Sequence, residues 1–334
     1  MAVRIKDVAK HAGVSTATVS HVINKTRYVS HEVETKVKLA MEELDYTPNP
    51  VARSLRNKKS FIIGLIVPIK NTDNSNHFFM SIANGIESVL KNEGYHLLLS
   101  NSQENYDEEI RCIKMFNTQN IDGLIIAPIE GASYYKEGVF GDYPIVFVDR
   151  KPKSNSKYGD CIVSESVEGT CSGIKAMVDK GIKRIGYISE ELSLTSVNER
   201  FQGYKQALME CGLPFDESLV LIGEISAANG YNYARTLISD HQVDGLFVAN
   251  NIMGKGVVSY IRDSKVKVPE ELGLIIFDDY EWTEVMDPPL SVIRQRSFEL
   301  GQKSAEVMMS RIQNPQKEYR EYRLPAELIL RNSF

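Results

Sequence analysis

Short polar side chains gather on one side of the segment 15–24, close to the N-terminus. On a helix, residues three and four positions apart lie on the same face, so these side chains would form one continuous polar row. Their hydroxyl, imidazole and amide groups can donate and accept hydrogen bonds, and could therefore bind the edge of another polar molecule. The polar members of this row are Thr16, Ser20, His21 and Asn24, and Ala17 lies on the same outer side.

The spacing of apolar residues predicts three helices around this row. A first helix starts at Ile5, and Gly13 ends it and permits a tight turn. Either Ser15 or Thr16 caps a second helix, and a third helix fits residues 32–44. This order predicts a helix-turn-helix, in which the second helix presents its N-terminal side chains to the major groove of DNA.

The alternative to a helix-turn-helix is a generic three-helix bundle at the N-terminus of an enzyme. The distribution of charge along the chain helps to decide between the two. Residues 1–60 carry 11 Lys and Arg against 6 Asp and Glu, whereas the whole chain carries 39 against 44. A basic head on an acidic body is expected when only the head meets a polyanion. The charge therefore favours DNA binding.

The rest of the chain shows no residue pattern typical of an enzyme or a metal site. It contains no His-Glu-x-x-His, no Gly-x-Ser-x-Gly and no phosphate-binding loop. The sequence has neither an apolar run long enough for a membrane span nor the apolar core of a secretory signal. We expect no enzyme, cofactor or metal, a cytoplasmic location, and free thiols at Cys112, Cys161, Cys171 and Cys211.

Two segments resemble the lactose-repressor (LacI/GalR) family of bacterial regulators. They are residues 5–24, IKDVAKHAGVSTATVSHVIN, and residues 45–55, DYTPNPVARSL. The resemblance implies an operator-binding regulator whose DNA-contacting residues are Ser15, Thr16, Ala17, Thr18, Ser20, His21, Asn24, Tyr46, Ala52 and Leu55.

The same resemblance places Thr16 and Ala17 at the main specificity positions of the recognition helix. Thr16 could reach base edges or a thymine methyl, and Ala17 can offer only apolar contact. The family usually has Arg where this chain has His21. An altered base preference is therefore expected, since Arg binds guanine through two hydrogen bonds and His offers one nitrogen at a time.

Residues 46–57 match the hinge of that family. Pro48 and Pro50 suit the start of a helix, and an isolated helix this short is marginal in water. The resemblance implies that the hinge helix forms only when two subunits pair on DNA, where Leu55 wedges into the minor groove. The alternative is a plain linker with Leu55 buried on the body.

Beyond residue 60, short apolar runs alternate with amphipathic helical stretches, which predicts parallel sheets covered by helices on both faces. A weak internal repeat, IDGLIIA at 121–127 and VDGLFVA at 243–249, suggests two similar lobes. The predicted strands are 62–67, 95–99, 123–126, 145–148, 184–188, 245–248 and 273–277. The predicted helices include 79–93, 110–119, 199–210 and 230–238.

The expected fold is therefore a small all-α head followed by a two-lobed α/β domain that resembles a periplasmic sugar-binding protein. The domains are predicted as 1–47 for the head, 48–59 for the hinge and 60–334 for effector binding and dimerisation. Lobe one would take about 61–160 and 291–322, and lobe two about 161–290 and 323–334. Because parallel sheets bind ligands beyond the C-terminal ends of their strands, a site is expected between the lobes.

The family resemblance nominates the residues of that site. The motifs ERFQGY at 199–204, VANN at 248–251 and FDDY at 277–280 carry the match. The implied effector-binding residues are Phe78, Phe79, Asp149, Arg200, Asn250 and Asp278. The alternative for Arg200 is a structural salt bridge.

An arginine and an aspartate across a cleft, with aromatic rings nearby, suit a small sugar or polyol. Asn251 replaces the usual Asp of the family, and Lys70 and Arg150 could lie near the cleft, which slightly favours a sugar acid. Some family members bind a protein corepressor instead, and that alternative stays open.

Three classes of function compete for this chain. A transport solute-binding protein would have no use for the head, and a Rossmann-type oxidoreductase would need a Gly-x-Gly-x-x-Gly turn that is absent here. A repressor uses every part: a dimer binds a near-palindromic operator, and a ligand in the cleft shifts the equilibrium between two states.

Overall fold

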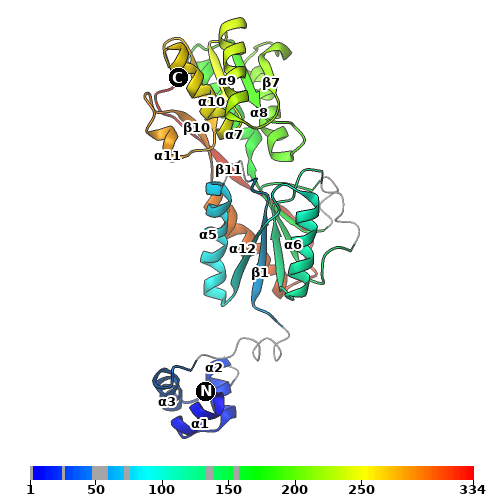
Figure 1. The fold of residues 1–334 in the computed structure, drawn as a ribbon, viewed down its shortest axis with the longest axis vertical. Helices are drawn as coiled ribbons and strands as arrows, with labels where there is room; N and C mark the ends of the chain where they lie inside the picture. Colours follow the sequence, from blue (N-terminus) through cyan, green and yellow to red (C-terminus); the bar gives the residue numbers. More distant parts are fainter. Residues whose placement is uncertain (1–2, 25–26, 47–58, 71–75, 132–137, 153–157) are drawn as a thin grey trace. The chain divides into compact units, whose positions relative to one another are not determined.

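The computed structural model describes residues 3–24, 27–46, 59–70, 76–131, 138–152 and 158–334. The chain divides into two compact units, Met1–Ser60 and Phe61–Phe334 (Figure 1). We call them the head and the body.

The head contains the helices α1 (Ile5–Ala12), α2 (Thr16–Asn24) and α3 (His31–Glu43). Gly13 adopts a left-handed conformation with φ of 66°, which allows the tight turn between α1 and α2. Val8, Val19 and Val37 are completely buried where the three helices meet. The predicted helix-turn-helix is thus confirmed, with its turn at the predicted glycine.

Lobe one of the body is a parallel sheet in the order β2-β1-β3-β4-β5, to which the first part of β11 is added. Helices α5 and α12 cover one face of the sheet and α6 covers the other (Figure 1). The elements are β1 (Ile62–Val67), α5 (Asn76–Leu90), β2 (His96–Asn101), α6 (Tyr106–Thr118), β3 (Gly123–Ile126), β4 (Ile145–Val148), β5 (Asp160–Glu165) and α12 (Ser297–Gln313).

Lobe two repeats this plan with strand order β7-β6-β8-β9-β10. Helices α9 and α10 cover one face, and α7 and α8 cover the other. The elements are α7 (Ser166–Asp179), β6 (Ile185–Ser189), α8 (Thr195–Glu210), β7 (Val220–Ile222), α9 (Ala227–Arg235), β8 (Gly245–Val248), α10 (Asn251–Ser264), β9 (Gly273–Phe277), α11 (Glu281–Glu284) and β10 (Ser291–Gln295).

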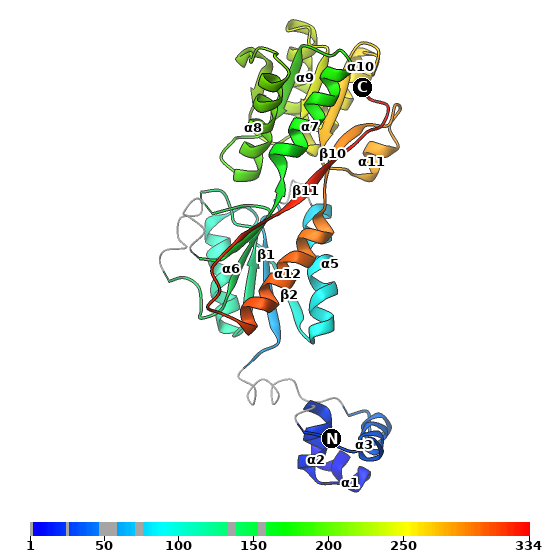
Figure 2. The same ribbon diagram turned by 180° about the vertical axis from the view of Figure 1, so that it is seen from behind.

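Strand β11 (Glu321–Ile329) joins the two sheets. Its first half pairs in parallel with β5, and its second half pairs antiparallel with β10. Figure 2 shows this strand, in red, running from one lobe to the other.

The strand pairing corrects the lobe boundaries expected from the sequence. Residues 160–165 pair with β4 and so belong to the sheet of lobe one, although we expected lobe two to begin at about residue 161. Residues 291–295 pair with β9 and belong to lobe two, although we expected lobe one to resume there. Both errors concern strands at the lobe junction, where the chain passes from one lobe into the other: β5 is followed by α7 of lobe two, and β10 by α12 of lobe one.

None of the helices in the described parts of the chain is long and apolar enough to cross a lipid bilayer.

Candidate functional site

The C-terminal ends of β4 and β9 face a small cavity between the lobes, which we call the inner cavity. Its volume is about 70 Å³. Residues from both lobes line it, including all six that the sequence nominated for effector binding: Phe78, Phe79, Asp149, Arg200, Asn250 and Asp278. The structure therefore brings together side chains that lie up to 200 positions apart in the chain.

Asp149 follows β4 directly and is only 7% exposed. Burial raises the pKa of its carboxyl group, and the positive charges of Arg150 and Arg200 partly oppose this shift. Arg150 is itself occupied: its Nη1 donates to Glu104 Oε2 at 2.6 Å, and its Nε lies 3.5 Å from Asp149 Oδ2. The charge of Arg150 is therefore balanced inside the protein.

Arg200 lies on α8 and is 6% exposed. Its Nη1 donates to the backbone oxygen of Ala249 at 2.6 Å, and its guanidinium carbon lies 3.9 Å above the ring of Phe277. Within the described residues Arg200 forms no ion pair with a carboxylate, which favours the effector-binding role over a structural salt bridge. Its buried Nε has no hydrogen-bond partner and remains available as a donor.

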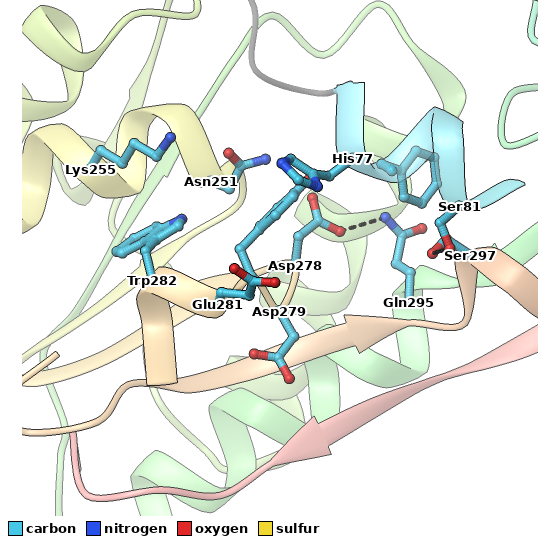
Figure 3. A pocket seen from close by; sticks show the side chains of 12 residues that line it. His77, Ser81, Asn251, Lys255, Asp278, Asp279, Glu281, Trp282, Gln295 and Ser297 are labelled. Atoms are coloured by element: carbon cyan, nitrogen blue, oxygen red, sulfur yellow. Dashed lines mark hydrogen bonds between the residues drawn. The ribbon is translucent and has the colours of Figure 1, made fainter. Parts of the chain in front are cut away.

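Asp278 follows β9 and is held by a residue that the sequence did not nominate. Gln295, at the end of β10, donates from Nε2 to Asp278 Oδ1 at 2.7 Å (Figure 3). Gln295 is 8% exposed, and its Oε1 is buried without a partner. Gln295 is not among the nominated residues because residue 295 was expected in lobe one, whereas the pairing of β10 with β9 places it beside Asp278.

Asn250 has a structural task at this site. It is the N-cap of α10: its Oδ1 accepts from the backbone nitrogens of Ile252 at 2.9 Å and Met253 at 3.3 Å. Its Nδ2 donates to Glu190 Oε1 at 3.1 Å. Most of its hydrogen-bonding capacity is therefore used within lobe two.

The two aromatic residues at the start of α5 differ in their burial. Phe79 is 3% exposed and packs in the core of lobe one. Phe78 is half-buried, and its ring contacts that of Phe79 edge-on with the centroids 5.2 Å apart. Phe78 is thus the ring better placed to contact a ligand.

A larger cavity of about 510 Å³ adjoins the inner cavity and shares Phe78, Asn251, Asp278, Tyr280 and Gln295 with it. We call it the outer cavity. Figure 3 shows His77 on the α5 side of it, and Lys255 on α10 opposite. Trp282, also in its lining, has an indole nitrogen that is buried without a partner.

Acidic side chains surround a further cavity of about 240 Å³, which shares Arg150 and Glu190 with the inner cavity. Lys70 lies there among Glu104, Glu130, Glu190, Glu191 and Glu224. Since Arg150 is also paired, neither of the two cations that favoured a sugar acid gives the cleft an excess of positive charge.

In the head, the residues nominated for DNA contact lie on or beside α2. Thr16 and Ala17 are exposed, and Thr18, Ser20 and His21 are half-buried. The exposed Ser15 is the cap of α2, because its Oγ accepts from the backbone nitrogen of Thr18 at 3.0 Å. Tyr46 packs against the core of the head. The side chain of Asn24, and the whole of Ala52 and Leu55, lie outside the described residues.

No group of His, Cys, Asp and Glu side chains in the described residues could hold a metal ion. The arrangement offers hydrogen bonding and ring contacts at the cleft, and a row of short polar side chains on α2.

Comparisons with known proteins agree with this arrangement. Residues 4–49 match the family model "Bacterial regulatory proteins, lacI family", and residues 174–334 match the model "Periplasmic binding protein-like domain". The HTH-type transcriptional repressor PurR of Vibrio atlanticus (strain LGP32) is 32% identical over 332 residues, which is 98% of each chain. The chain belongs to the lacI family of bacterial regulatory proteins. A second relative, PurR of Pasteurella multocida (strain Pm70), is 33% identical over 335 residues, again 98% of each chain.

Solved structures of lacI-family regulators have the same fold. The Lac repressor bound to ONPG in the repressed state superposes with a TM-score of 0.84 at 26% identity, and both chains are covered completely. A complex of the transcriptional regulator CelR with cellobiose superposes with a TM-score of 0.75 at 25% identity, covering 99% of this chain and 100% of CelR. The predicted family, the predicted fold and the predicted function as a ligand-regulated, DNA-binding transcriptional regulator are confirmed.

Proposed function

We propose that this lacI-family protein is a cytoplasmic repressor without enzymatic activity. It binds a palindromic operator as a homodimer, and a small polyhydroxylated ligand, a sugar, in the cleft controls it. The operator contacts come from the nominated residues on and beside α2 and in the hinge, and the ligand contacts come from the six nominated residues around the inner cavity together with Gln295.

One observation carries the ligand part of the proposal: two residues that line the inner cavity each have a buried side-chain atom without a hydrogen-bond partner. Arg200 Nε is a donor and Gln295 Oε1 is an acceptor, and both are buried and unsatisfied. A buried polar group without a partner costs about 1–3 kcal/mol, so a ligand that pairs with it regains that energy. A sugar hydroxyl suits both atoms because it donates and accepts.

The size of the cleft supports a ligand larger than the inner cavity alone. Small-molecule sites usually have volumes of about 300–1,000 Å³. The inner cavity has about 70 Å³ and the adjoining outer cavity about 510 Å³. A bound sugar ring would therefore contact Arg200 and Asp278 and extend past Phe78 into the outer cavity.

The charges at the cleft favour a neutral sugar over a sugar acid. Arg150 is paired with Glu104 and Asp149, and the neighbouring cavity is rich in glutamate. An additional carboxylate on the ligand would meet this negative surface, and like charges repel. A sugar acid is therefore the weaker of the two ligand classes predicted from the sequence.

The control mechanism follows from the two lobes. A ligand that binds better to one lobe arrangement than to the other shifts the equilibrium between them by its difference in affinity. The sign of that shift decides whether the ligand releases or promotes operator binding.

Thermal unfolding of the purified protein against sugars, sugar acids, sugar phosphates and nucleobases tests the proposal. A compound present at 100 times its Kd should stabilise the folded protein by about 2.7 kcal/mol. Arg200→Ala should abolish the shift caused by such a compound. Arg262→Ala, which removes an exposed arginine of the same lobe, is the matched control and should leave the shift intact.

A clear shift with a neutral sugar that Arg200→Ala removes supports the proposal. A shift only with sugar acids would contradict the argument from charge. If no compound shifts the melting temperature, a protein corepressor becomes the better candidate for the partner.

A further inference from the structure

Charged side chains from both lobes meet where the lobes join. Glu199 accepts from Arg323 Nη2 at 2.8 Å and from Lys151 Nζ at 3.1 Å. Lys151 Nζ also lies 3.3 Å from Glu321 Oε2, and Arg323 Nε lies 3.6 Å from Glu165 Oε1. We call Lys151, Glu165, Glu199, Glu321 and Arg323 the junction network.

Within the junction network, Glu199 is the member that comes from lobe two. Lys151 follows β4 of lobe one, and Glu165 ends β5 of the same lobe. Glu321 and Arg323 lie on the half of β11 that pairs with β5. The contacts of Glu199 therefore connect α8 to lobe one.

A second contact strengthens this connection. The backbone nitrogen of Lys151 donates to Thr195 Oγ1, in the first turn of α8, at 3.0 Å. The first two turns of α8 are thus bound to the segment that follows β4. That segment begins with Asp149, which lines the inner cavity from lobe one.

The electrostatics of Glu199 agree with a strong attachment. Its side chain is 18% exposed, and that of Arg323 is 28% exposed, so the contact is partly buried but remains accessible to dissolved ions. Partial burial by itself would raise the pKa of Glu199, but hydrogen bonds from Arg323 and Lys151 lower it overall. The carboxylate therefore keeps its charge and its partners at neutral pH.

Glu199 directly precedes Arg200, and adjacent residues of a helix point about 100° apart. One turn of α8 thus directs Glu199 to the lobe junction and Arg200 to the inner cavity. We propose that Glu199 is a positioning residue of the ligand site, which anchors α8 to lobe one and sets the separation of Arg200 from Asp149 across the cleft. The importance of this separation for ligand binding rests on the function proposed above.

The test measures the separation of the lobes without any ligand. Fluorescent dyes on Met115→Cys in α6 and Met209→Cys in α8 report it by energy transfer, because both positions are exposed and lie in different lobes. Cys211→Ser removes the native cysteine that is not buried. Sodium chloride is the probe, since the screening length falls from about 10 Å at 0.1 M to about 3 Å at 1 M.

We expect the transfer efficiency of the wild-type protein to change between 0.1 M and 1 M salt as the junction network weakens. At 0.1 M salt, Glu199→Gln should already have the transfer efficiency that the wild type reaches at 1 M. Its transfer efficiency should not change further when salt is added. Glu199→Asp keeps the charge and should restore part of the salt response. Glu306→Gln, which removes an exposed pair with Lys303 inside one helix, should behave as the wild type.

The proposal is wrong if the transfer efficiency of Glu199→Gln responds to salt as much as that of the wild type does. It is also wrong if the transfer efficiency of the wild-type protein does not depend on salt. Arg323→Gln gives a second test from the other side of the contact, should Glu199→Gln fold poorly. Because no ligand is present, a failed search for ligands leaves this result unaffected, and the two proposals can fail separately.

Discussion

Asp149 and Asp278 occupy equivalent positions in the two lobes and line the same cavity. Each follows the last residue of a parallel strand with a positive φ, 66° at Asp149 and 76° at Asp278. Each also donates its backbone N–H to the neighbouring strand, to Ile162 at 2.9 Å and to Ile293 at 2.8 Å. Such a backbone costs about 1–3 kcal/mol outside glycine, and strain of this kind is common at binding sites.

The raised pKa of Asp149 predicts how pH affects stability. Because burial raises the folded-state pKa, the folded protein binds a proton there more tightly than the unfolded chain does. The ionised carboxylate therefore destabilises the fold, and this penalty appears as the pH rises from the unfolded pKa, about 3.9, through the folded value.

Asp149→Asn should raise the melting temperature at pH 8, and the gain should vanish as the pH falls below about 4. Calorimetry at both pH values checks this. The exposed Asp263→Asn is the control and should change neither melting temperature. If the Asp149→Asn protein melts below the wild type at pH 8, the attraction of the carboxylate to Arg150 and Arg200 outweighs the effect of burial.

The buried pair of Asp160 and Arg311 predicts a large stability effect. Its two contacts measure 2.6 Å and 3.0 Å, and the two side chains are only 1% and 5% exposed. Asp160→Ala should cost about 3–5 kcal/mol, because it leaves a buried charge without its partner.

Chemical denaturation measures this loss. Removing both charges with Asp160→Leu and Arg311→Met should cost less than Asp160→Ala alone. Glu306→Ala breaks an exposed pair and should cost at most about 1 kcal/mol. Equal losses for the buried and the exposed pair would refute the assignment.

Ser15, which the sequence nominated for DNA contact, also has a structural role as the cap of α2. Its Oγ accepts from the backbone nitrogen of Thr18, so Ser15→Ala should destabilise α2 by about 1 kcal/mol. Hydrogen exchange of the α2 amides in the full-length protein should become faster by about fivefold. Thr16→Ala, at the neighbouring exposed position, should leave the exchange unchanged, and a similar acceleration there would contradict a specific cap.

His21→Arg should change the base preference of the operator. An arginine that binds guanine through two hydrogen bonds is worth about 1–3 kcal/mol of discrimination. Selection of operators from a random DNA library should therefore recover guanine at one position of each half-site for His21→Arg, and not for the wild type. His96→Arg adds the same charge in the body and should select the wild-type sequences. If His21→Arg selects the same operator sequences as the wild type, residue 21 does not take part in base recognition.

The strands of the body were easy to predict where both faces are buried. The runs at 62–67, 123–126, 145–148, 245–248 and 273–277 were predicted with the bounds that the structure has, since a strand covered on both faces is continuously apolar. β5 and β10 begin or end with polar residues such as Asp160 and Gln295, which are buried beside charged partners. Their pattern is weaker, and the lobe boundaries were misplaced for that reason.

The sequence predicted which residues line the candidate site, but it did not predict which residues form hydrogen bonds with them. Short motifs nominated Arg200, Asn250 and Asp278, and the structure places all of them at the inner cavity. Their contacts come from distant segments: Gln295 binds Asp278, and Glu190 binds Asn250. No local pattern reveals such pairs, because the sheet order decides which strand ends become neighbours.

Strand β11 also has a consequence for how the protein can tolerate change. Its nine residues are aligned with β5 at one end and with β10 at the other. An inserted or deleted residue near Pro325 would shift one half against its partner strand and turn each inward side chain outward. The core of lobe one and the core of lobe two would then each require a different register of β11. Insertions and deletions among homologous chains should therefore be rarer in β11 than in the loops. The length of this strand fixes the alignment of the two lobes relative to each other.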